Sequence, residues 1–533
     1  MSEPVVPGRR TFLLQSGLVV SGAALTGLSL PGPRRAAAAV LPPEGARPVA
    51  AQGLQIGDVT GERAIVWSRA DRPARLLVEW DTQARFGNPR RVVGPHALDT
   101  TDYTARVDLT DLPRDREIFL RVSFVDLGNG RAQSEPTYGR FRSAPQHRRG
   151  VRFVWSGDTA GQGFGINPDI GGMRIYETMR ARRPDFFLHS GDTIYADGPI
   201  PAEKVVEDGK LWRNVVTPEK SKVAETLDEF RGAYRYNLLD DNVRRFNAEV
   251  PQIWQWDDHE VTNNWSSAKD LSANTAYTEK NVPLLVARGT RAFLEYAPLR
   301  RHGDEESERV YRRIGYGCHL DLFTLDMRSY RGPNTNNLQT SQNSETEFLG
   351  ATQLAWIKRQ LLDSRATWKV IAADMPIGLH VPDGKDAAGG DLWEGIANGD
   401  DGVPLGREQE IAELLRFIKH WRIRDVVWLT ADVHYCAAHH YDPSRARFTD
   451  FEPFWEFVAG PLNAGAFGPN KLDGTFGPEV VFQKAPPAAN YSPLSGYQFF
   501  GQVDIDERSA ALQVSLVDLD GNVVFEKTLD PSR

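Results

Sequence analysis

The chain has 533 residues, of which 63 are Lys or Arg and 71 are Asp or Glu, so its formal net charge is -8 at pH 7. This length exceeds the usual size of one hydrophobic core and predicts two domains. The mildly acidic balance, with no long basic run after the N-terminus, argues against specific binding of nucleic acid. With only two cysteines, Cys318 and Cys436, the fold cannot depend on a disulfide framework, and whether the two pair stays open.

The N-terminus has the pattern of an export signal. Gly8-Arg9-Arg10-Thr11-Phe12-Leu13-Leu14 is a twin-arginine sequence, a weakly apolar stretch runs from Leu18 to Leu30, and Ala36-Ala37-Ala38-Ala39 resembles a cleavage region. A membrane anchor is the alternative, but the apolar run is short and is interrupted by polar and Gly residues. We therefore predict a twin-arginine signal peptide over residues 1–39, export through the twin-arginine machinery, and a secreted, periplasmic or cell-wall-associated protein with no stable membrane anchor.

Short alternating apolar segments follow between Pro48 and Arg142, for example Leu76–Trp80 and Ile118–Val122, with Gly, Pro and Asp turns between them. This pattern predicts a small antiparallel β-sandwich domain over residues 40–145. It contains no convergent cluster of polar residues, so we expect it to pack against or shape the site of another domain.

The pattern changes after the polar stretch Ser143–Gly150, because strand-like runs then alternate with helical segments. The helical segments are Met173 to Arg183, Thr352 to Leu362 and Arg407 to Trp421. This alternation predicts an α/β domain over residues 146–533. The last segment, Tyr497 to Leu529, alternates again around an Asp520-Gly521 turn and is expected to close the second sheet of that domain.

Five apolar runs end directly before an acidic or histidine-containing motif. The runs are 153–157 before Asp158, 186–191 before Asp192, 253–256 before Asp257-Asp258-His259-Glu260, 370–373 before Asp374, and 426–431 before Asp432-Val433-His434. Ligands bind beyond the carboxyl ends of strands in an α/β sheet, so five such ends can converge on one site. Any one Asp taken alone is as readily a helix cap or turn former. Together they predict a metal site, since oxygen and imidazole ligands hold the ions that activate water, and two ions about 3.5–4 Å apart suit phosphoryl transfer.

Three of these motifs resemble those of the PhoD-type alkaline phosphatases (alkaline phosphatase D family) of the calcineurin-like metallophosphoesterase superfamily. They are Gly191-Asp192-Thr193-Ile194-Tyr195, Trp256-Asp257-Asp258-His259-Glu260-Val261-Thr262-Asn263-Asn264 and Ala431-Asp432-Val433-His434. They are more distantly similar to the motifs of purple acid phosphatases. The resemblance covers essentially the mature chain and implies an α/β, four-layer metallophosphoesterase sandwich, with two mixed sheets flanked by helices, behind the N-terminal antiparallel β-sandwich.

The resemblance also implies a set of metal ligands. Asp158 would bind one ion, Asp192 would bridge two ions, and Tyr195 would bind iron. The further implied ligands are Asp258, Asp432, His434 and Asp374, the last in a position that carries a His in purple acid phosphatases. The implied cofactors are Fe(III) and Ca2+, with other divalent ions as the alternative.

One position departs from the family. PhoD-type enzymes often have a Ser-Cys pair after the first catalytic strand, and this chain has Ser156-Gly157-Asp158 there. The thiolate ligand is therefore absent, and Asp158 is expected to replace it with an oxygen ligand. Cys436 is a separate candidate for a place near the site, because on a strand it would share a face with His434.

The resemblance implies that His259 approaches the phosphate or the leaving oxygen. Arg231 and Arg328, the latter near Arg331, lie in segments that resemble family motifs and could hold phosphate bidentately. For each arginine a structural ion pair is an equal alternative.

We therefore expect an exported, monomeric, metal-dependent phosphoester hydrolase that acts on small molecules. Its expected activity is that of an alkaline phosphatase, releasing inorganic phosphate from phosphomonoesters by attack of a metal-bound hydroxide. A phosphodiesterase or phospholipase-D-like enzyme on the same site is the alternative. A non-catalytic extracellular binding protein is a third interpretation, which the complete set of candidate ligands disfavours.

Overall fold

The computed structural model describes residues 44–301, 306 and 308–532. The predicted signal peptide over residues 1–39 lies outside this range. Within the described residues, no helix is both long and apolar enough to cross a membrane.

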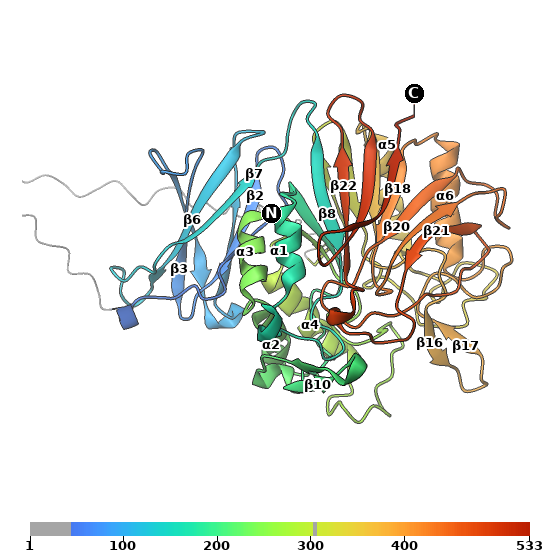
Figure 1. The fold of residues 1–533 in the computed structure, drawn as a ribbon, viewed down its shortest axis with the longest axis horizontal. Helices are drawn as coiled ribbons and strands as arrows, with labels where there is room; N and C mark the ends of the chain where they lie inside the picture. Colours follow the sequence, from blue (N-terminus) through green and yellow to red (C-terminus); the bar gives the residue numbers. More distant parts are fainter. Residues whose placement is uncertain (1–43, 302–305, 307, 533) are drawn as a thin grey trace, which may run out of the picture. The chain divides into compact units, whose positions relative to one another are not determined.

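A nine-stranded sheet holds three of the five predicted strands at its centre (Figure 1). These parallel strands are β8 (Val151–Ser156), β9 (Phe186–Ser190) and β12 (Gln252–Gln255). Beside β8 the sheet continues antiparallel through β22 (Phe499–Ile505), β23 (Leu512–Asp518) and β24 (Val523–Leu529). Beside β12 it continues through β1 (Leu54–Gly57), β2 (Ala64–Arg69) and β5 (Thr104–Leu109).

A seven-stranded sheet holds the other two predicted strands, β15 (Trp368–Ala372) and β18 (Val426–Thr430). They form a parallel centre with β14 (Leu320–Thr324) and β20 (Phe454–Val458). The antiparallel strands at its margins are β13 (Arg312–Tyr316), β19 (Cys436–Tyr441) and β21 (Pro478–Lys484). All five predicted strands are thus confirmed, but they are divided between two sheets.

The two sheets face each other across an apolar core. Phe153, Trp155 and Leu188 from the first sheet pack with Val370 and Leu429 from the second. Val154, between Phe153 and Trp155 on β8, instead belongs to the core on the other face of the first sheet. This alternation follows from the two-residue period of a strand, and it shows that β8 is apolar on both faces.

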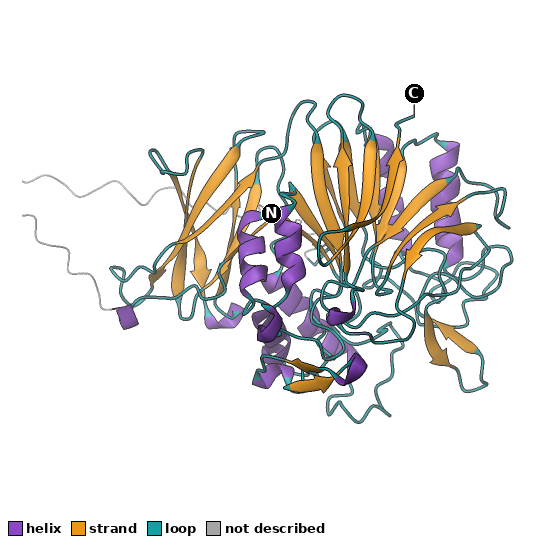
Figure 2. Ribbon diagram, viewed as in Figure 1, coloured by secondary structure: helices purple, strands orange, loops and turns teal. Residues whose placement is uncertain are grey.

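Helices cover the outer faces (Figure 2). Against the first sheet pack α1 (Arg174–Ala181), α2 (Leu227–Asn237), α3 (Asp241–Glu249) and α4 (Val282–Tyr296). Against the second pack α5 (Gly350–Asp363) and α6 (Glu408–His420). The three helical segments predicted from the sequence are confirmed as α1, α5 and α6. The resulting order of helix, sheet, sheet and helix confirms the four-layer sandwich.

The N-terminal region contains the predicted antiparallel sandwich. Its outer sheet has the order β4-β3-β6-β7, with β3 (Ala74–Asp81), β4 (Arg90–Ala97), β6 (Glu117–Asp126) and β7 (Thr137–Arg142). This sheet packs through Leu76 and Val122 onto Leu54 and Val66 of β1 and β2. The second layer, β1-β2-β5, is part of the nine-stranded sheet, because β1 pairs with β12 at Gly57 and Gln252. A Cβ at Gly57 would collide with the carbonyl of Pro298, so this junction requires glycine.

The C-terminal strands correct one prediction. Tyr497–Leu529 was expected to close the second sheet, whereas β22, β23 and β24 extend the first sheet through pairing of β22 with β8. Gly501 permits this pairing, because a Cβ there would collide with the indole ring of Trp155. The predicted hairpin turn at Asp520-Gly521 does connect β23 to β24, and Gly521 has a left-handed φ of 87°. Alternation of apolar residues identifies buried faces, but it carries no information about which sheet edge a strand joins.

Two long Gly- and Pro-rich regions of the second half of the chain contain strands. Asp383–Gly406 begins inside a hairpin of β16 (Pro382–Lys385) and β17 (Asp391–Trp393), and Gly460–Ser492 contains β21. A further short hairpin is formed by β10 (Glu203–Val205) and β11 (Leu211–Arg213).

Candidate metal centre

The candidate ligands follow the carboxyl ends of strands from both sheets. Asp158, Asp192 and Asp432 each stand one residue beyond the end of a strand, after Gly157 beyond β8, after Gly191 beyond β9 and after Ala431 beyond β18. Their φ angles are 70°, 51° and 66°, and that of His434 is 59°. Left-handed conformations are unfavourable for residues other than glycine, and they cluster at functional sites where the surrounding structure holds them. Here they end each strand abruptly and turn the chain over the centre.

The acidic and histidine side chains form three overlapping groups. In each group the potential ligand atoms lie within 4.8 Å of one another, and the groups are Asp158, Asp192 and His434; Asp192, Asp258 and His259; and Asp257, Asp258 and Asp432. Asp192 belongs to the first two groups and Asp258 to the last two. The groups therefore form a row in which Asp192 and Asp258 are suited to bridging neighbouring ions.

Tyr195 joins the first group through His434. The Tyr195 hydroxyl lies 2.8 Å from Nε2 of His434, and that same nitrogen is 3.5 Å from Oδ1 of Asp158. Nδ1 of His434 donates to the carbonyl oxygen of Gly465, so Nε2 is the ring nitrogen that could bind a metal ion. Burial lowers the pKa of His434 to about 4, so the imidazole is neutral, as a metal ligand must be.

His259 forms a pair with Asp197, a residue that the sequence analysis missed. Nδ1 of His259 lies 2.6 Å from Oδ1 of Asp197, whose Oδ2 accepts the backbone N–H of Asn263 at 2.7 Å. Burial opposes a charge on the ring, but the carboxylates of Asp197 and Asp258 raise the pKa of His259 to about 9. Asp197 stands two residues after Tyr195, and its polar side chain in the loop that carries the motif is a signal that could have identified it.

The buried carboxylates need balancing charge. Within the described chain, Oδ2 of Asp158, Oδ2 of Asp257, Oδ1 of Asp258 and both oxygens of Asp374 are buried without a hydrogen-bond partner. Burial and neighbouring carboxylates raise the pKa values of Asp158, Asp192 and Asp432 well above the usual range. Unpaired charges at such depth are costly, and cations relieve both the charge and the missing contacts. The residues therefore fit a centre of more than one metal ion.

Two other predicted residues lie beside this cluster. Nε of Arg328 donates to Oδ1 of Asp257 at 2.6 Å, and the same atom is 3.5 Å from Oδ2 of Asp374. The side chain of Arg328 is completely buried and also pairs with Glu394. Asp374 thus lies next to Asp257, although it is in none of the three groups.

Arg231 has a different environment. Nε of Arg231, on α2, donates to Oε2 of Glu295 on α4 at 2.7 Å, and Nη2 donates to the carbonyl of Thr100 at 2.8 Å. These contacts connect two helices to the N-terminal sandwich. They favour the structural ion pair over the phosphate-binding role.

The two cysteines are not paired, and Gly157 is closely enclosed by its neighbours. Cys318 is exposed and Cys436 is buried, and neither forms a disulfide. A Cβ at Gly157 would lie 3.1 Å from Cβ of Ala431 and 3.1 Å from the carbonyl oxygen of Gly191, so this position is closely enclosed. At this strand end, Asp158 and not Gly157 supplies a potential metal ligand, which is a carboxylate oxygen in the group with Asp192 and His434.

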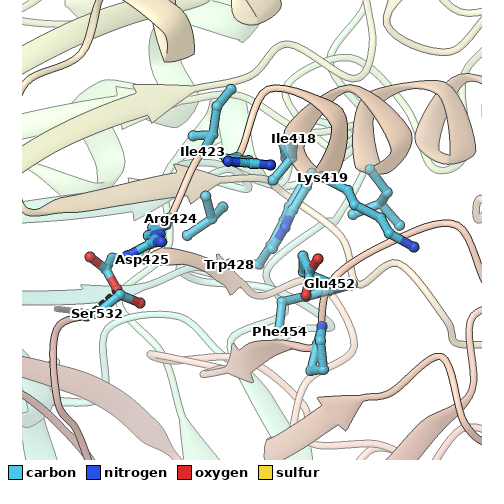
Figure 3. A pocket seen from close by; sticks show the side chains of 13 residues that line it. Ile418, Lys419, Ile423, Arg424, Asp425, Trp428, Glu452, Phe454 and Ser532 are labelled. Atoms are coloured by element: carbon cyan, nitrogen blue, oxygen red, sulfur yellow. Dashed lines mark hydrogen bonds between the residues drawn. The ribbon is translucent and has the colours of Figure 1, made fainter.

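A cavity of about 450 Å³ lies at the other end of β18 (Figure 3). It is lined by residues at the end of α6 and the start of β18 and β20, including Ile418, Lys419, Trp428 and Phe454. None of the predicted site residues is among the 13 that line it. Asp432 follows the opposite end of β18, so this cavity is separate from the candidate centre.

Comparison with known proteins agrees with these observations. The family described as PhoD-like phosphatase matches residues 153–516, and the family described as PhoD-like phosphatase, N-terminal domain, matches residues 35–145. Alkaline phosphatase D from Bacillus subtilis (strain 168) is 28% identical over 337 residues, which are 60% of this chain and 53% of the relative, so the match spans about half of that protein.

Two solved structures have a similar fold over most of the chain. The structure of PhoD has a TM-score of 0.67 at 19% identity and covers 92% of this chain and 94% of its own. The purple acid phosphatase PPD1 from yellow lupin (Lupinus luteus) seeds has a TM-score of 0.58 at 14% identity and covers 91% of this chain and 75% of its own. At these identities the likeness establishes the fold, and the family models account for both regions of the chain. The chain therefore belongs to the PhoD-like phosphatase family.

Proposed function

We propose that this protein is a metal-dependent phosphoester hydrolase that acts as an alkaline phosphatase on phosphomonoesters. The observation that carries the proposal is the row of three ligand groups that share Asp192 and Asp258, beside the imidazole of His259. Membership of the PhoD-like phosphatase family and the similarity to alkaline phosphatase D of Bacillus subtilis support it.

We assign the ligands by their chemistry. Asp158, Asp192, Tyr195 and His434 would hold Fe(III), because this set combines oxygen donors, a phenol and an imidazole. The carboxylates of Asp257, Asp258 and Asp432, with Asp374 nearby, would hold Ca2+ or another hard divalent ion. When bound, such ions polarise phosphoryl oxygens and make water a stronger nucleophile.

His259 would protonate the leaving group. Because Nδ1 of His259 is hydrogen-bonded to Asp197, Nε2 is the ring nitrogen available to substrate. Nε2 lies 3.9 Å from Oδ1 of Asp258. With a pKa of about 9 the ring carries its proton through neutral and mildly alkaline pH. Nε2 can therefore donate a hydrogen bond to a phosphate oxygen or a proton to the departing alkoxide.

Export and organisation remain part of the proposal. Residues 1–39 would direct the protein through the twin-arginine machinery to the periplasm, the cell wall or the medium. The mature chain would comprise an N-terminal domain over 40–145 and a catalytic domain over 146–533, acting as a monomer on small phosphoesters.

The test compares a monoester with a diester on the metal-loaded protein. We expect a higher kcat/KM for p-nitrophenyl phosphate than for bis(p-nitrophenyl) phosphate, and the reverse ratio would favour the phosphodiesterase alternative. Asp192→Asn should lower kcat/KM by more than the roughly 10–100-fold that is typical of residues supporting a ligand. The matched control is Asp520→Asn, in an exposed turn where the side chain is 69% accessible. Full activity of Asp192→Asn would refute the bridging role, and lack of hydrolysis of both esters by the wild type would refute the proposed function.

A further inference from the structure

Arg328 lies between two carboxylates and has no surface exposure. Nε donates to Oδ1 of Asp257 at 2.6 Å, and Nη1 donates to Oε1 of Glu394. All three side chains are at most 1% accessible. Because both pairs are buried, the contacts of this guanidinium identify it as a support for Asp257.

The contact with Arg328 determines how Asp257 can act. Oδ1 is held by the guanidinium, while Oδ2 is buried without a hydrogen-bond partner in the described chain. The carboxylate therefore has one oxygen committed to Arg328 and one available to a cation in the group with Asp258 and Asp432. Fixed orientation of this kind raises the affinity of a ligand for its metal.

Glu394 in turn holds Arg328 in place. It directly follows β17, and its Oε1 also accepts Nη1 of Arg331 at 2.8 Å. Its Oε2 accepts Nδ2 of Asn334 at 2.8 Å, and its backbone carbonyl accepts Nη1 of Arg407 at 2.9 Å. Charge-assisted bonds at both carboxylate oxygens leave Glu394 a single orientation in a buried site.

A second connection runs from the same hairpin to Asp258. Asp383, on β16, accepts Nδ2 of Asn264 at 2.9 Å through Oδ1 and Nδ2 of Asn334 at 2.8 Å through Oδ2. The backbone N–H of Asn264 donates to Oδ2 of Asp258. Hairpin β16–β17 thus reaches Asp257 through Glu394 and Arg328, and Asp258 through Asp383 and Asn264.

The other end of the row is supported by different segments. Nδ1 of His434 donates to Gly465, and the backbone N–H of Asn463 donates to the carbonyl of Asp158. Lys220 donates through Nζ to the carbonyl of Tyr195 at 2.6 Å. The contacts of Glu394 and Asp383 therefore support Asp257 and Asp258, and they do not reach Asp158, Tyr195 or His434.

We propose that Glu394 and Asp383 are positioning residues through which hairpin β16–β17 sets the affinity for the cation held by Asp257, Asp258 and Asp432, and not for the cation held by Asp158, Asp192 and His434. The inference rests on the proposed metal-dependent function. Asp257, Asp258 and Asp432 offer only carboxylate oxygens, so their cation should be a hard divalent ion. A chelator should remove that cation more readily than an ion bound by His434 and Tyr195.

The test is titration of Ca2+ into the full-length protein after treatment with EGTA, followed by calorimetry. Glu394→Gln should weaken Ca2+ binding about 10–100-fold. The metal retained after EGTA, measured by elemental analysis, and the visible spectrum should stay unchanged. Saturating Ca2+ should restore most of kcat. The matched control is Glu413→Gln, because Glu413 is half-exposed on α6 and pairs with Lys358 of α5; this variant should bind Ca2+ like the wild type.

Asp383→Asn provides the second variant, because its side chain is 18% accessible and less able to disturb folding. Asp383→Asn should also weaken Ca2+ binding. If Glu394→Gln does not fold, the result for Asp383→Asn is the test of the inference. Unchanged Ca2+ affinity in both variants, equal loss of both cations, or absence of Ca2+ binding by the wild type would overturn the inference. Phosphatase activity is measured separately, so a wild type that binds Ca2+ selectively but hydrolyses no phosphoester would refute the proposed function and leave this inference standing.

Discussion

Gly161→Ala tests the assignment of Tyr195 without altering a ligand. A Cβ at Gly161 would lie 2.6 Å from both Cε2 and Cζ of Tyr195, whereas ordinary contacts begin at 3.4 Å. The difference of 0.8 Å between these two distances must be absorbed by the phenol ring or by the backbone. The backbone is restrained, because the N–H groups of Ala160 and Gly161 both point to the carbonyl of Asn463. We therefore expect most of the displacement at the ring.

A displacement of that size matters at a metal site. Ligand distances tolerate about 0.2 Å, and a misplacement of about 1 Å can cost about 100-fold in rate. We expect kcat/KM for p-nitrophenyl phosphate to fall by about 10–100-fold, with a changed or weakened visible absorption from tyrosinate bound to iron. Overpacking should lower the free energy of unfolding by only about 1–3 kcal/mol.

The control for this experiment is Gly130→Ala, at an exposed turn where a Cβ would meet no atom within 4 Å. It should retain wild-type activity, spectrum and stability. The reasoning would be refuted by a folded Gly161→Ala protein with full activity and an unaltered spectrum. Loss of activity together with global unfolding would show instead that the close approach serves packing.

Three further predictions concern charge. Asp197→Asn removes a carboxylate that raises the pKa of His259, so the alkaline limb of the kcat/KM profile should move to lower pH, and an unmoved limb would contradict the role of the pair. Burial raises the pKa of Glu408 to about 9, so the folded state retains this proton and unfolding free energy should fall as pH rises from about 4.5 towards 9. Glu408→Gln should therefore have a higher melting temperature than the wild type at pH 9 but not at pH 4. A difference in melting temperature that is the same at both pH values would contradict this prediction. Arg312→Met leaves Asp58 buried without its main partner, both being 1% accessible, and should cost about 3–5 kcal/mol in urea unfolding; a loss below about 1 kcal/mol would show that the pair contributes little.

Several features of the site could be predicted because their signals are local. An apolar run such as 153–157 that stops at Asp158, or 186–191 that stops at Asp192, identifies a strand and the residue that turns out of it. Family motifs then order these strand ends, and the structure brings Asp158, Asp192 and His434 within reach of one ion. The helices α1, α5 and α6 were predictable for the same reason, since their periodicity lies within a single segment.

Other features depend on partners that are distant in sequence. Arg328 and Arg231 both lie in segments that resemble family motifs. Arg328 pairs with Asp257 beside the centre, whereas Arg231 pairs with Glu295 and contacts the N-terminal sandwich. Asp197 gains its role only because His259 lies 2.6 Å away from it. The C-terminal strands extend the first sheet, where Gly501 of β22 makes room for the ring of Trp155 on β8.

By itself, then, the amino-acid sequence identified the five strands that precede the candidate ligands, the positions of these ligands and the chemistry of their side chains, and the family resemblance added the four-layer class. Only the tertiary structure decided which carboxylates lie close enough to hold one ion together, which arginine contacts Asp257, and that hairpin β16–β17 is linked to Asp257 and Asp258. The physical reason is that apolar periodicity and chain reversal are encoded in neighbouring residues, whereas the partner of a buried charge is selected among all residues that folding brings to it.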